Sequence, residues 1–191
     1  MPPSSPKPRT VREQNVDRTR QAILDAAQIL FATRGYAEAG VRDIAAKAGA
    51  NPALIARYYG SKLELFEAAL EASLDVSLFT SVDRASFGEH AAEAFFKTRP
   101  DAASVIPMLV FSASDSQARQ VALKLLARQV IRPLEIWFDE PEAIERTAQL
   151  MAVITGFYTY RLMLPLEPLK GRPSRAMRDW LVRTLQEIVD R

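Results

Sequence analysis

The side chains with the clearest chemistry are the basic residues of the first third of the chain. Residues 1–62 hold ten Lys or Arg against five Asp or Glu, a net charge of +5. The remaining residues hold fifteen basic and eighteen acidic side chains, a net charge of −3. A basic front on an acidic body suggests a polyanion as partner of the front. The alternative is an ordinary scatter of surface charge.

The residue types that enzymes use most are scarce. The chain has no cysteine, which excludes disulfides, thiolate metal sites and a cysteine nucleophile. His90 is the single histidine, so a multi-histidine metal site is excluded as well. No G-x-S-x-G, P-loop or metal-ligand cluster occurs. We expect no enzyme activity, no cofactor and no metal, and we expect His90 at the surface or at a helix end.

Among the basic residues, Arg57 has the position best suited to recognise a particular base. It lies between Ile55 and Tyr59, whose spacing of four predicts that both face one side of a helix and leave Arg57 on the other. A guanidinium in that position pairs bidentately with O6 and N7 of a guanine. A phosphate contact is the alternative.

The elements that must position Arg57 are helices. With 191 residues, 48% of them apolar, the chain is long enough to bury a core. It shows no sustained alternation and no hairpin turn, and helical spacing recurs in block after block, so we expect an all-α fold. The expected N-terminal helices span residues 14–34, 41–48, 52–59 and 61–74. Glycines end the first three, and Asn51 and Ser61 supply N-caps for the last two.

The helices over 41–48 and 52–59, joined by Gly49-Ala50-Asn51, form a helix-turn-helix over residues 41–60. Gly49 allows a left-handed turn, and Pro52 fixes the entry of the second helix. The residues that face outward are Pro52, Ala53, Leu54, Arg57 and Tyr58. A helix that projects its N-terminus and one basic residue suits a major groove. The alternative is a helical hairpin that only packs.

Four landmarks in this region resemble a known family. They are Arg34-Gly35-Tyr36, Val41-Arg42-Asp43-Ile44-Ala45, Ala48-Gly49-Ala50 and Tyr59-Gly60-Ser61-Lys62. Residues 16–75 thereby resemble the N-terminal domain of the tetracycline-repressor (TetR) family of bacterial transcriptional regulators. The resemblance implies a dimeric, ligand-responsive DNA-binding regulator with one helix-turn-helix per subunit.

By position, the resemblance also implies roles for single residues. The base-contacting residues would be Pro52, Ala53, Leu54 and Arg57. The phosphate-contacting residues would be Arg42, Asn51, Tyr58 and Lys62. Two departures matter: Gly40 stands where Thr or Ser usually caps the second helix, and the start of the recognition helix is less polar than usual. Leu54 would suit a thymine methyl group.

The rest of the chain predicts a helical body. We expect a basic Pro-rich tail over 1–13, a DNA-binding domain over 14–75 and an effector-binding and dimerisation domain over 76–191. The tail's Lys7, Arg9 and Arg12 suit a minor groove or phosphates, although a solvated tail is the preferred interpretation. The expected body helices span residues 87–98, 101–112, 116–138, 141–164 and 174–190. Pro107 and Pro133 should kink or interrupt two of them.

Two groups of apolar side chains in the body are candidates for a functional role. The last two helices carry apolar stripes. In a dimer these stripes would pack against the same helices of the second subunit, which by resemblance is also how the family dimerises. Burial of the stripes inside one subunit is the alternative. The expected interface residues are Met151, Thr155, Tyr158, Leu162, Met177, Trp180, Leu181, Leu185 and Ile188. By resemblance an effector pocket lies in the middle of the body, with plain core as the alternative for each residue. Its expected lining is Phe95, Phe96, Met108, Phe111, Trp137 and Phe157.

The combined expectation is a homodimeric repressor that binds double-stranded DNA at a palindromic operator. A small apolar or amphipathic effector would release it. No apolar run reaches the roughly 18 residues of a membrane span, and the first residues lack the apolar stretch of a signal peptide, so we expect a cytoplasmic protein. The alternative function is an all-α ligand sensor that signals through a protein partner without contacting DNA.

Overall fold

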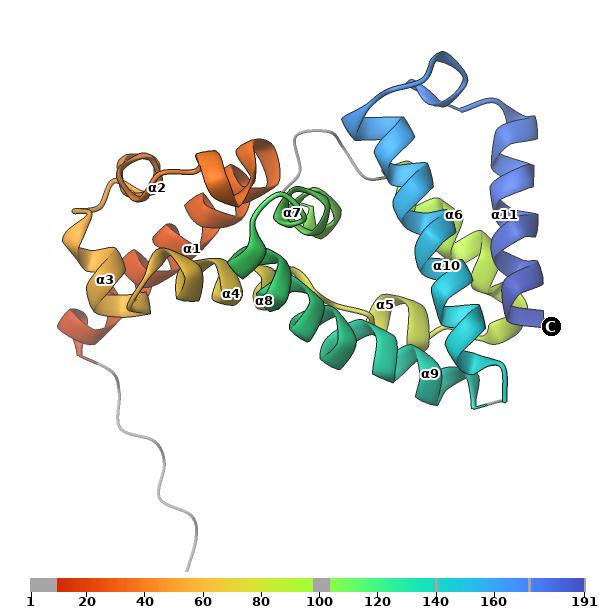
Figure 1. The fold of residues 1–191 in the computed structure, drawn as a ribbon, viewed down its shortest axis with the longest axis horizontal. Helices are drawn as coiled ribbons and strands as arrows, with labels where there is room; N and C mark the ends of the chain where they lie inside the picture. Colours follow the sequence, from red (N-terminus) through yellow and green to blue (C-terminus); the bar gives the residue numbers. More distant parts are fainter. Residues whose placement is uncertain (1–9, 98–103, 140, 172, 191) are drawn as a thin grey trace, which may run out of the picture.

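A computed structural model describes residues 10–97, 104–139, 141–171 and 173–190, and over these ranges the chain is helical without any strand. Figure 1 shows α1–α4 at one end of the molecule and α6, α10 and α11 at the other, with α7–α9 between them. No helix among the described residues is both long and apolar enough to cross a membrane. The helices are α1 (Val11–Glu38), α2 (Val41–Lys47), α3 (Ala53–Tyr59), α4 (Lys62–Ser73), α5 (Ser77–Thr80), α6 (Phe87–Lys97), α7 (Val105–Ser112), α8 (Ser116–Leu126), α9 (Arg132–Phe138), α10 (Ala143–Tyr158) and α11 (Arg175–Asp190). Shorter helical turns are Arg84–Ser86, Ala127–Ile131, Thr159–Met163 and Glu167–Leu169.

The first helix begins earlier than its sequence pattern predicts. Thr10 and Glu13 form a capping box, in which the Thr10 hydroxyl accepts from the Glu13 amide at 3.3 Å and the Glu13 carboxylate accepts from the Thr10 amide at 2.8 Å. The expected helix start at residue 14 is therefore wrong, and Arg12 belongs to the exposed first turn of α1. Lys7 and Arg9 lie outside the described residues.

Gly35 marks a kink in α1, after which one more turn leads to Glu38. Its φ of +76° is a left-handed conformation that favours glycine. A Cβ built on Gly35 would lie 3.0 Å from the Cβ of Phe111. Gly35 is thus needed both for its backbone conformation and for the close approach of α7 to α1.

The buried apolar side chains form two cores. The first lies inside α1–α4 and is completed by residues of α7 and α8, among them Met108, Ala118 and Leu125. The second lies among α6, α9, α10 and α11. Helix α4 contributes Leu65, Phe66, Ala69 and Leu70 to the first core.

Of the two internal prolines, only Pro133 coincides with an interruption of its α-helix. Pro107 is the third residue of α7, where no amide donor is needed, so α7 is not interrupted. Pro133 follows a π-helical turn over Ala127–Ile131, which joins α8 to α9 with right-handed helical backbone throughout. A π-turn shifts the hydrogen-bond pattern by one residue, and the chain continues as one rod instead of breaking.

Candidate nucleic-acid interface

Helices α2 and α3 form the predicted helix-turn-helix. Ile44 and Ile55 are buried and hold the two helices together. Gly49 has a φ of +62° in the turn, as its left-handed role requires. The Asn51 side-chain oxygen accepts from the Ala53 amide at 2.9 Å, so Asn51 caps α3 from the position predicted for it.

A second contact fixes α3 against the long first helix. The Tyr59 hydroxyl donates to the Arg20 carbonyl at 2.8 Å, and the Arg20 guanidinium lies 5.4 Å from the centre of the Tyr59 ring. Burial raises the pKa of Tyr59 above its ordinary value. The orientation of α3 is therefore set by α1 as well as by α2.

The residues expected to contact bases occupy two different environments. Pro52, Ala53 and Arg57 are exposed along one side of α3. Arg57 forms no hydrogen bond or ion pair with any described residue, so its guanidinium is available to a partner. Leu54 is partly buried, because α3 packs on the first core with Leu54 as well as with Ile55. The expectation that Leu54 projects fully outward is therefore wrong.

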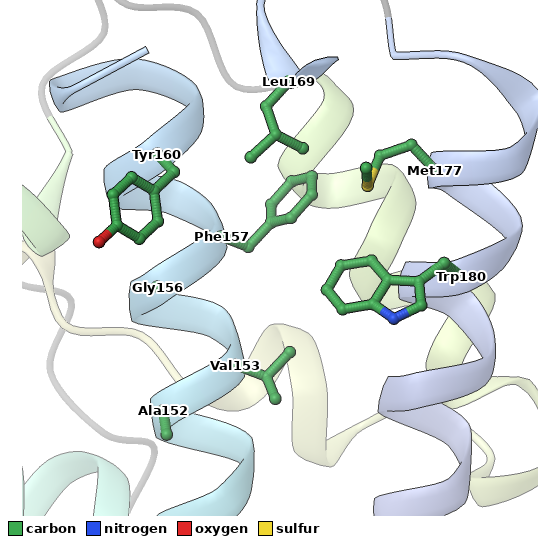
Figure 2. Close-up of a pocket in the computed structure, with 8 residues that line it drawn as sticks. All are labelled: Ala152, Val153, Gly156, Phe157, Tyr160, Leu169, Met177 and Trp180. Atoms are coloured by element: carbon green, nitrogen blue, oxygen red, sulfur yellow. The ribbon is translucent and has the colours of Figure 1, made fainter. Parts of the chain in front are cut away.

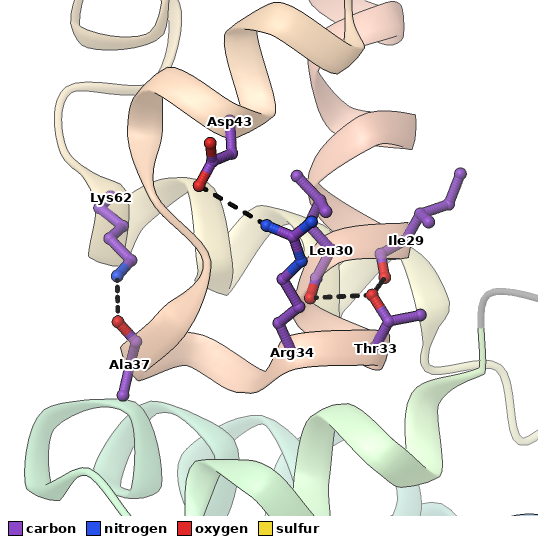
Figure 3. A network of polar contacts seen from close by, with 7 residues as sticks. All are labelled: Ile29, Leu30, Thr33, Arg34, Ala37, Asp43 and Lys62. Atoms are coloured by element: carbon purple, nitrogen blue, oxygen red, sulfur yellow. Dashed lines mark hydrogen bonds and ion pairs between the residues drawn. The ribbon is translucent and has the colours of Figure 1, made fainter.

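The residues expected to contact phosphate also differ from one another. Arg42 and Asn51 are exposed, whereas Tyr58 is partly buried against the first core. The Lys62 ammonium donates to the Ala37 carbonyl at 3.3 Å and lies 4.5 Å from the centre of the Tyr36 ring. Burial lowers the pKa of Lys62 below its ordinary value. The sequence pattern does not predict this contact with the end of α1, which Figure 3 shows.

The start of α2 lacks a side-chain cap, as Gly40 predicts. The backbone of Gly40 has the extended conformation of an N-cap, but it offers no acceptor to the first amides of α2. Asp43 instead lies 3.7 Å from Arg34, with both side chains more than half exposed, and Figure 3 shows this pair beside the Lys62 contact. Arg34 thus connects α1 to α2 at the edge of the interface.

An apolar cavity of about 510 Å³ opens within the helical body. It lies among the end of α4, α6, α7, α10 and the rod formed by α8, the π-turn and α9, and we call it the apolar cavity. Its polar groups include Ser104, Thr155 and Tyr158. Burial raises the pKa of Tyr158, and a hydrogen bond with Ser104 opposes that effect. The apolar lining consists of Leu74, Val76, Phe79, Ala94, Phe95, Val105, Ile106, Leu109, Leu126, Val130, Leu134, Leu150, Met151 and Ile154.

Of the six residues expected to line an effector pocket, only Phe95 lines this cavity. Met108 is buried in the first core and Phe111 packs on Gly35. Both residues lie on the side of α7 that packs against α1 and its core. Trp137 packs on the rings of Phe87 and Phe138. Two further corrections concern Phe96 and Phe157, which border other hollows.

A second hollow of about 450 Å³ lies between α10 and α11 on the outside of the molecule, and Figure 2 shows its lining. We call it the outer hollow. The Trp180 side chain is 44% exposed and Tyr160 is 48% exposed, which is unusual for large aromatic side chains. The lining residues are Ala152, Val153, Gly156, Phe157, Tyr160, Leu169, Met177 and Trp180.

The expected dimer residues divide between this surface and the interior. Met177 and Trp180 border the outer hollow, whereas Met151 and Thr155 line the apolar cavity and Leu162 packs against the second core. Four expected interface residues are buried within the single chain: three belong to α11, which packs on α6 and α10, and the fourth, Tyr158, faces the apolar cavity. They are Tyr158, Leu181, Leu185 and Ile188. For these four, interior packing replaces the expected interface role.

Two family models match the chain. The model of bacterial regulatory proteins of the tetR family matches residues 23–69, and the tetracyclin repressor-like C-terminal domain matches residues 85–189. The second match alone covers more than half of the 191 residues. The chain belongs to the TetR family of bacterial regulatory proteins.

Individual relatives agree with this TetR-family assignment. The chain is 36% identical over 87 residues to the HTH-type transcriptional activator FasR of Mycolicibacterium smegmatis, a match that covers 42% of this chain and 40% of FasR. It is 41% identical over 61 residues to the HTH-type transcriptional repressor NicS of Pseudomonas putida, covering 32% of this chain and 29% of NicS. The chain thus spans two fifths or less of the length of these two curated relatives. The structure of Salmonella enterica GusR shares the fold, with a TM-score of 0.68 at 16% identity over 91% of this chain and 96% of GusR.

Proposed function

We propose that this chain is a sequence-specific DNA-binding transcriptional regulator. It acts by binding rather than by catalysis, as a homodimer on a palindromic operator in the bacterial cytoplasm, and a small apolar or amphipathic effector releases it. The observation that carries the proposal is the exposed side of α3, where Arg57 has no partner among the described residues while α3 itself is held by Ile55, Asn51 and Tyr59. A rigid short helix with an unpaired guanidinium is what base recognition in a major groove requires.

Homodimerisation is supported by the outer hollow. Trp180 and Met177 of α11 and Tyr160 of the turn Thr159–Met163 form apolar surface that a single chain leaves open to water. A second copy related by a two-fold axis would cover this surface and present two α3 helices to one face of the DNA. Such a dimer recognises two half-sites about one helical turn, roughly 34 Å, apart.

The apolar cavity is the proposed effector site. Its volume of about 510 Å³ falls within the range of small-molecule sites, and its lining is mostly apolar with a few polar groups. The hydroxyls of Thr155 and Tyr158 and the exposed ammonium of Lys97 border it. This lining suits a ligand with an apolar body and one polar end.

Helix α4 connects the proposed effector site to the DNA-binding side. Ser73 and Leu74, at the end of α4, line the cavity, and the π-turn contributes Val130 to the same lining. Glu71 of α4 accepts from Arg128 at 2.6 Å and from Gln129 at 3.1 Å, both in the π-turn. An effector that pushes the cavity walls apart would therefore move α4.

Repression and release follow from that connection. An effector that favours one position of α4 must disfavour operator binding by the same coupling free energy, typically about 1–3 kcal/mol. We propose a repressor, while the curated relatives include both an activator and a repressor.

Selection of an operator from pooled random duplexes tests the proposed function. The wild-type chain should enrich a palindromic sequence, and in a gel shift it should bind that duplex at least a thousandfold more tightly than a scrambled one. Failure to enrich any sequence would contradict the proposal and favour a ligand sensor that acts through a protein partner.

A further inference from the structure

A third hollow, of about 600 Å³, lies where the end of α6, the turn Thr159–Met163 and the start of α11 meet. It shares no lining residue with the apolar cavity or the outer hollow. We call it the arginine hollow, because three of its lining side chains are guanidiniums. Its described lining is Phe96, Arg161, Gly171, Pro173, Arg175 and Arg178.

Two of these guanidiniums share one aromatic ring. The guanidinium carbons of Arg161 and Arg178 each lie 5.9 Å from the centre of the Phe96 ring. Each cation is attracted to the ring, but two positive charges beside one ring also repel one another. An anion placed between them would remove that repulsion.

Arg161 lacks the acceptors that a partly buried guanidinium needs. One terminal nitrogen donates to the carbonyls of Phe96 and Gly171 at 3.4 Å each, which is at the long limit for a hydrogen bond. Its Nε is buried without an acceptor. Within the described ranges no carboxylate lies within 4.0 Å of Arg161. Burial lowers its pKa, and only Tyr158 opposes that effect.

The carboxylates among the described residues offset only part of the positive charge of the hollow. Arg175 and Arg178 occupy the first turn of the 16-residue helix α11, where the helix dipole disfavours positive charge. Asp179 lies 3.8 Å from Arg175, whose side chain is 95% exposed, so this pair is weak. Glu93 forms its ion pair with Lys97 at 2.8 Å and attracts Arg178 only from a longer distance.

We propose that the arginine hollow binds a small organic anion, a carboxylate or phosphate ester that carries a flat apolar group. The anionic oxygens would accept paired hydrogen bonds from Arg161 and Arg178, as carboxylates and phosphates do with guanidinium groups. The flat group would pack on the Phe96 ring. The volume of about 600 Å³ suits a ligand of this size. This second ligand site is independent of DNA recognition and of the apolar cavity.

The proposal is tested by calorimetric titration of the full chain with phenyl phosphate, with benzyl alcohol as the uncharged probe and inorganic phosphate as the probe without a ring. Phenyl phosphate should bind, and both other probes should bind at least tenfold more weakly. Arg178→Ala and Arg161→Gln should each weaken phenyl phosphate at least tenfold. Arg183→Ala, an exposed arginine of α11 outside the lining, is the matched control and should change nothing.

Four results of these titrations would overturn the proposal. They are the absence of phenyl phosphate binding, equal binding of benzyl alcohol, equal binding of inorganic phosphate, and an equal loss in Arg183→Ala. Arg57→Ala guards against binding of the probe at the DNA-binding side, and a loss of affinity there would also refute the assignment. If Arg178→Ala weakens dimerisation and leaves phenyl phosphate unaffected, the hollow receives a carboxylate of the second copy and the proposal fails. Arg178 is exposed, so its variant should fold, as circular dichroism would verify.

Discussion

Arg57→Ala should weaken binding to the selected operator while it leaves the protein intact. Arg57 is exposed and has no hydrogen bond or ion pair with a described residue, so its loss should change the free energy of unfolding by less than about 0.5 kcal/mol. One bidentate guanine contact is worth about 1–3 kcal/mol of discrimination. A homodimer on a palindrome loses two such contacts, about 2–6 kcal/mol in all, so operator affinity should fall at least about thirtyfold.

Fluorescence anisotropy measures this effect. Wild type and variant are each titrated on the selected operator and on a scrambled duplex at one salt concentration. The scrambled duplex should lose little affinity, because Arg57 is assigned to a base edge. Arg42→Ala is the matched control, since Arg42 is an exposed arginine assigned to phosphate and should weaken both duplexes alike. Equal losses on the two duplexes for Arg57→Ala would refute its role in base recognition.

Four further predictions follow from the contacts described above. Lys62→Ala should lower Tm, because the contact with the end of α1 is lost, and should flatten the salt dependence on any duplex by about two units, one from each subunit of the dimer; a changed operator preference would contradict the phosphate assignment. Gly40→Ser should stabilise the fold by about 0.5–1 kcal/mol, seen as a higher Tm, since the extended backbone accepts a side chain and a hydroxyl would cap α2; an unchanged or lower Tm would exclude a cap. Trp180→Glu should give a folded monomer in sedimentation, and an unchanged dimer would move the interface away from the outer hollow. Thr155→Phe should fill the apolar cavity and weaken operator binding without any effector. Adding Glu71→Gln to that variant should restore part of the operator affinity, because it weakens the contact between α4 and the π-turn. If Thr155→Phe leaves operator binding unchanged, the proposed coupling between the cavity and α4 is refuted.

The helix-turn-helix could be predicted from the sequence because its signals are local. Asn51 caps α3 and Ser61 caps α4, and Gly49 takes the left-handed conformation expected of it. The same kind of signal was present at Thr10 and Glu13, but the prolines before them obscured the start of α1. Local capping therefore predicts helix ends well wherever the neighbouring residues do not compete.

The body was harder to predict because periodicity identifies an apolar face but not what covers it. Leu181 and Leu185 lie on the expected stripe of α11, yet α6 and α10 of the same chain bury them. Met108 has the character of a pocket residue and lies instead in the first core. The contact of the Lys62 ammonium likewise depends on Tyr36 and Ala37, which only the folded chain brings near.

Helices α7 and α8 complete the first core, and this limits where the chain can be divided to make fragments or chimaeras. A fragment that ends at residue 75 would lack Met108, Ala118 and Leu125, and would leave their apolar contacts on α1 and α4 open to water. A chimaera that joins α1–α4 to a foreign sensor at that point would inherit the same defect. A cut after Leu126, the last residue of α8, would keep the first core whole but would separate α6 from its partners α9, α10 and α11 in the second core. The DNA-binding side therefore cannot be exchanged cleanly without the sensing side.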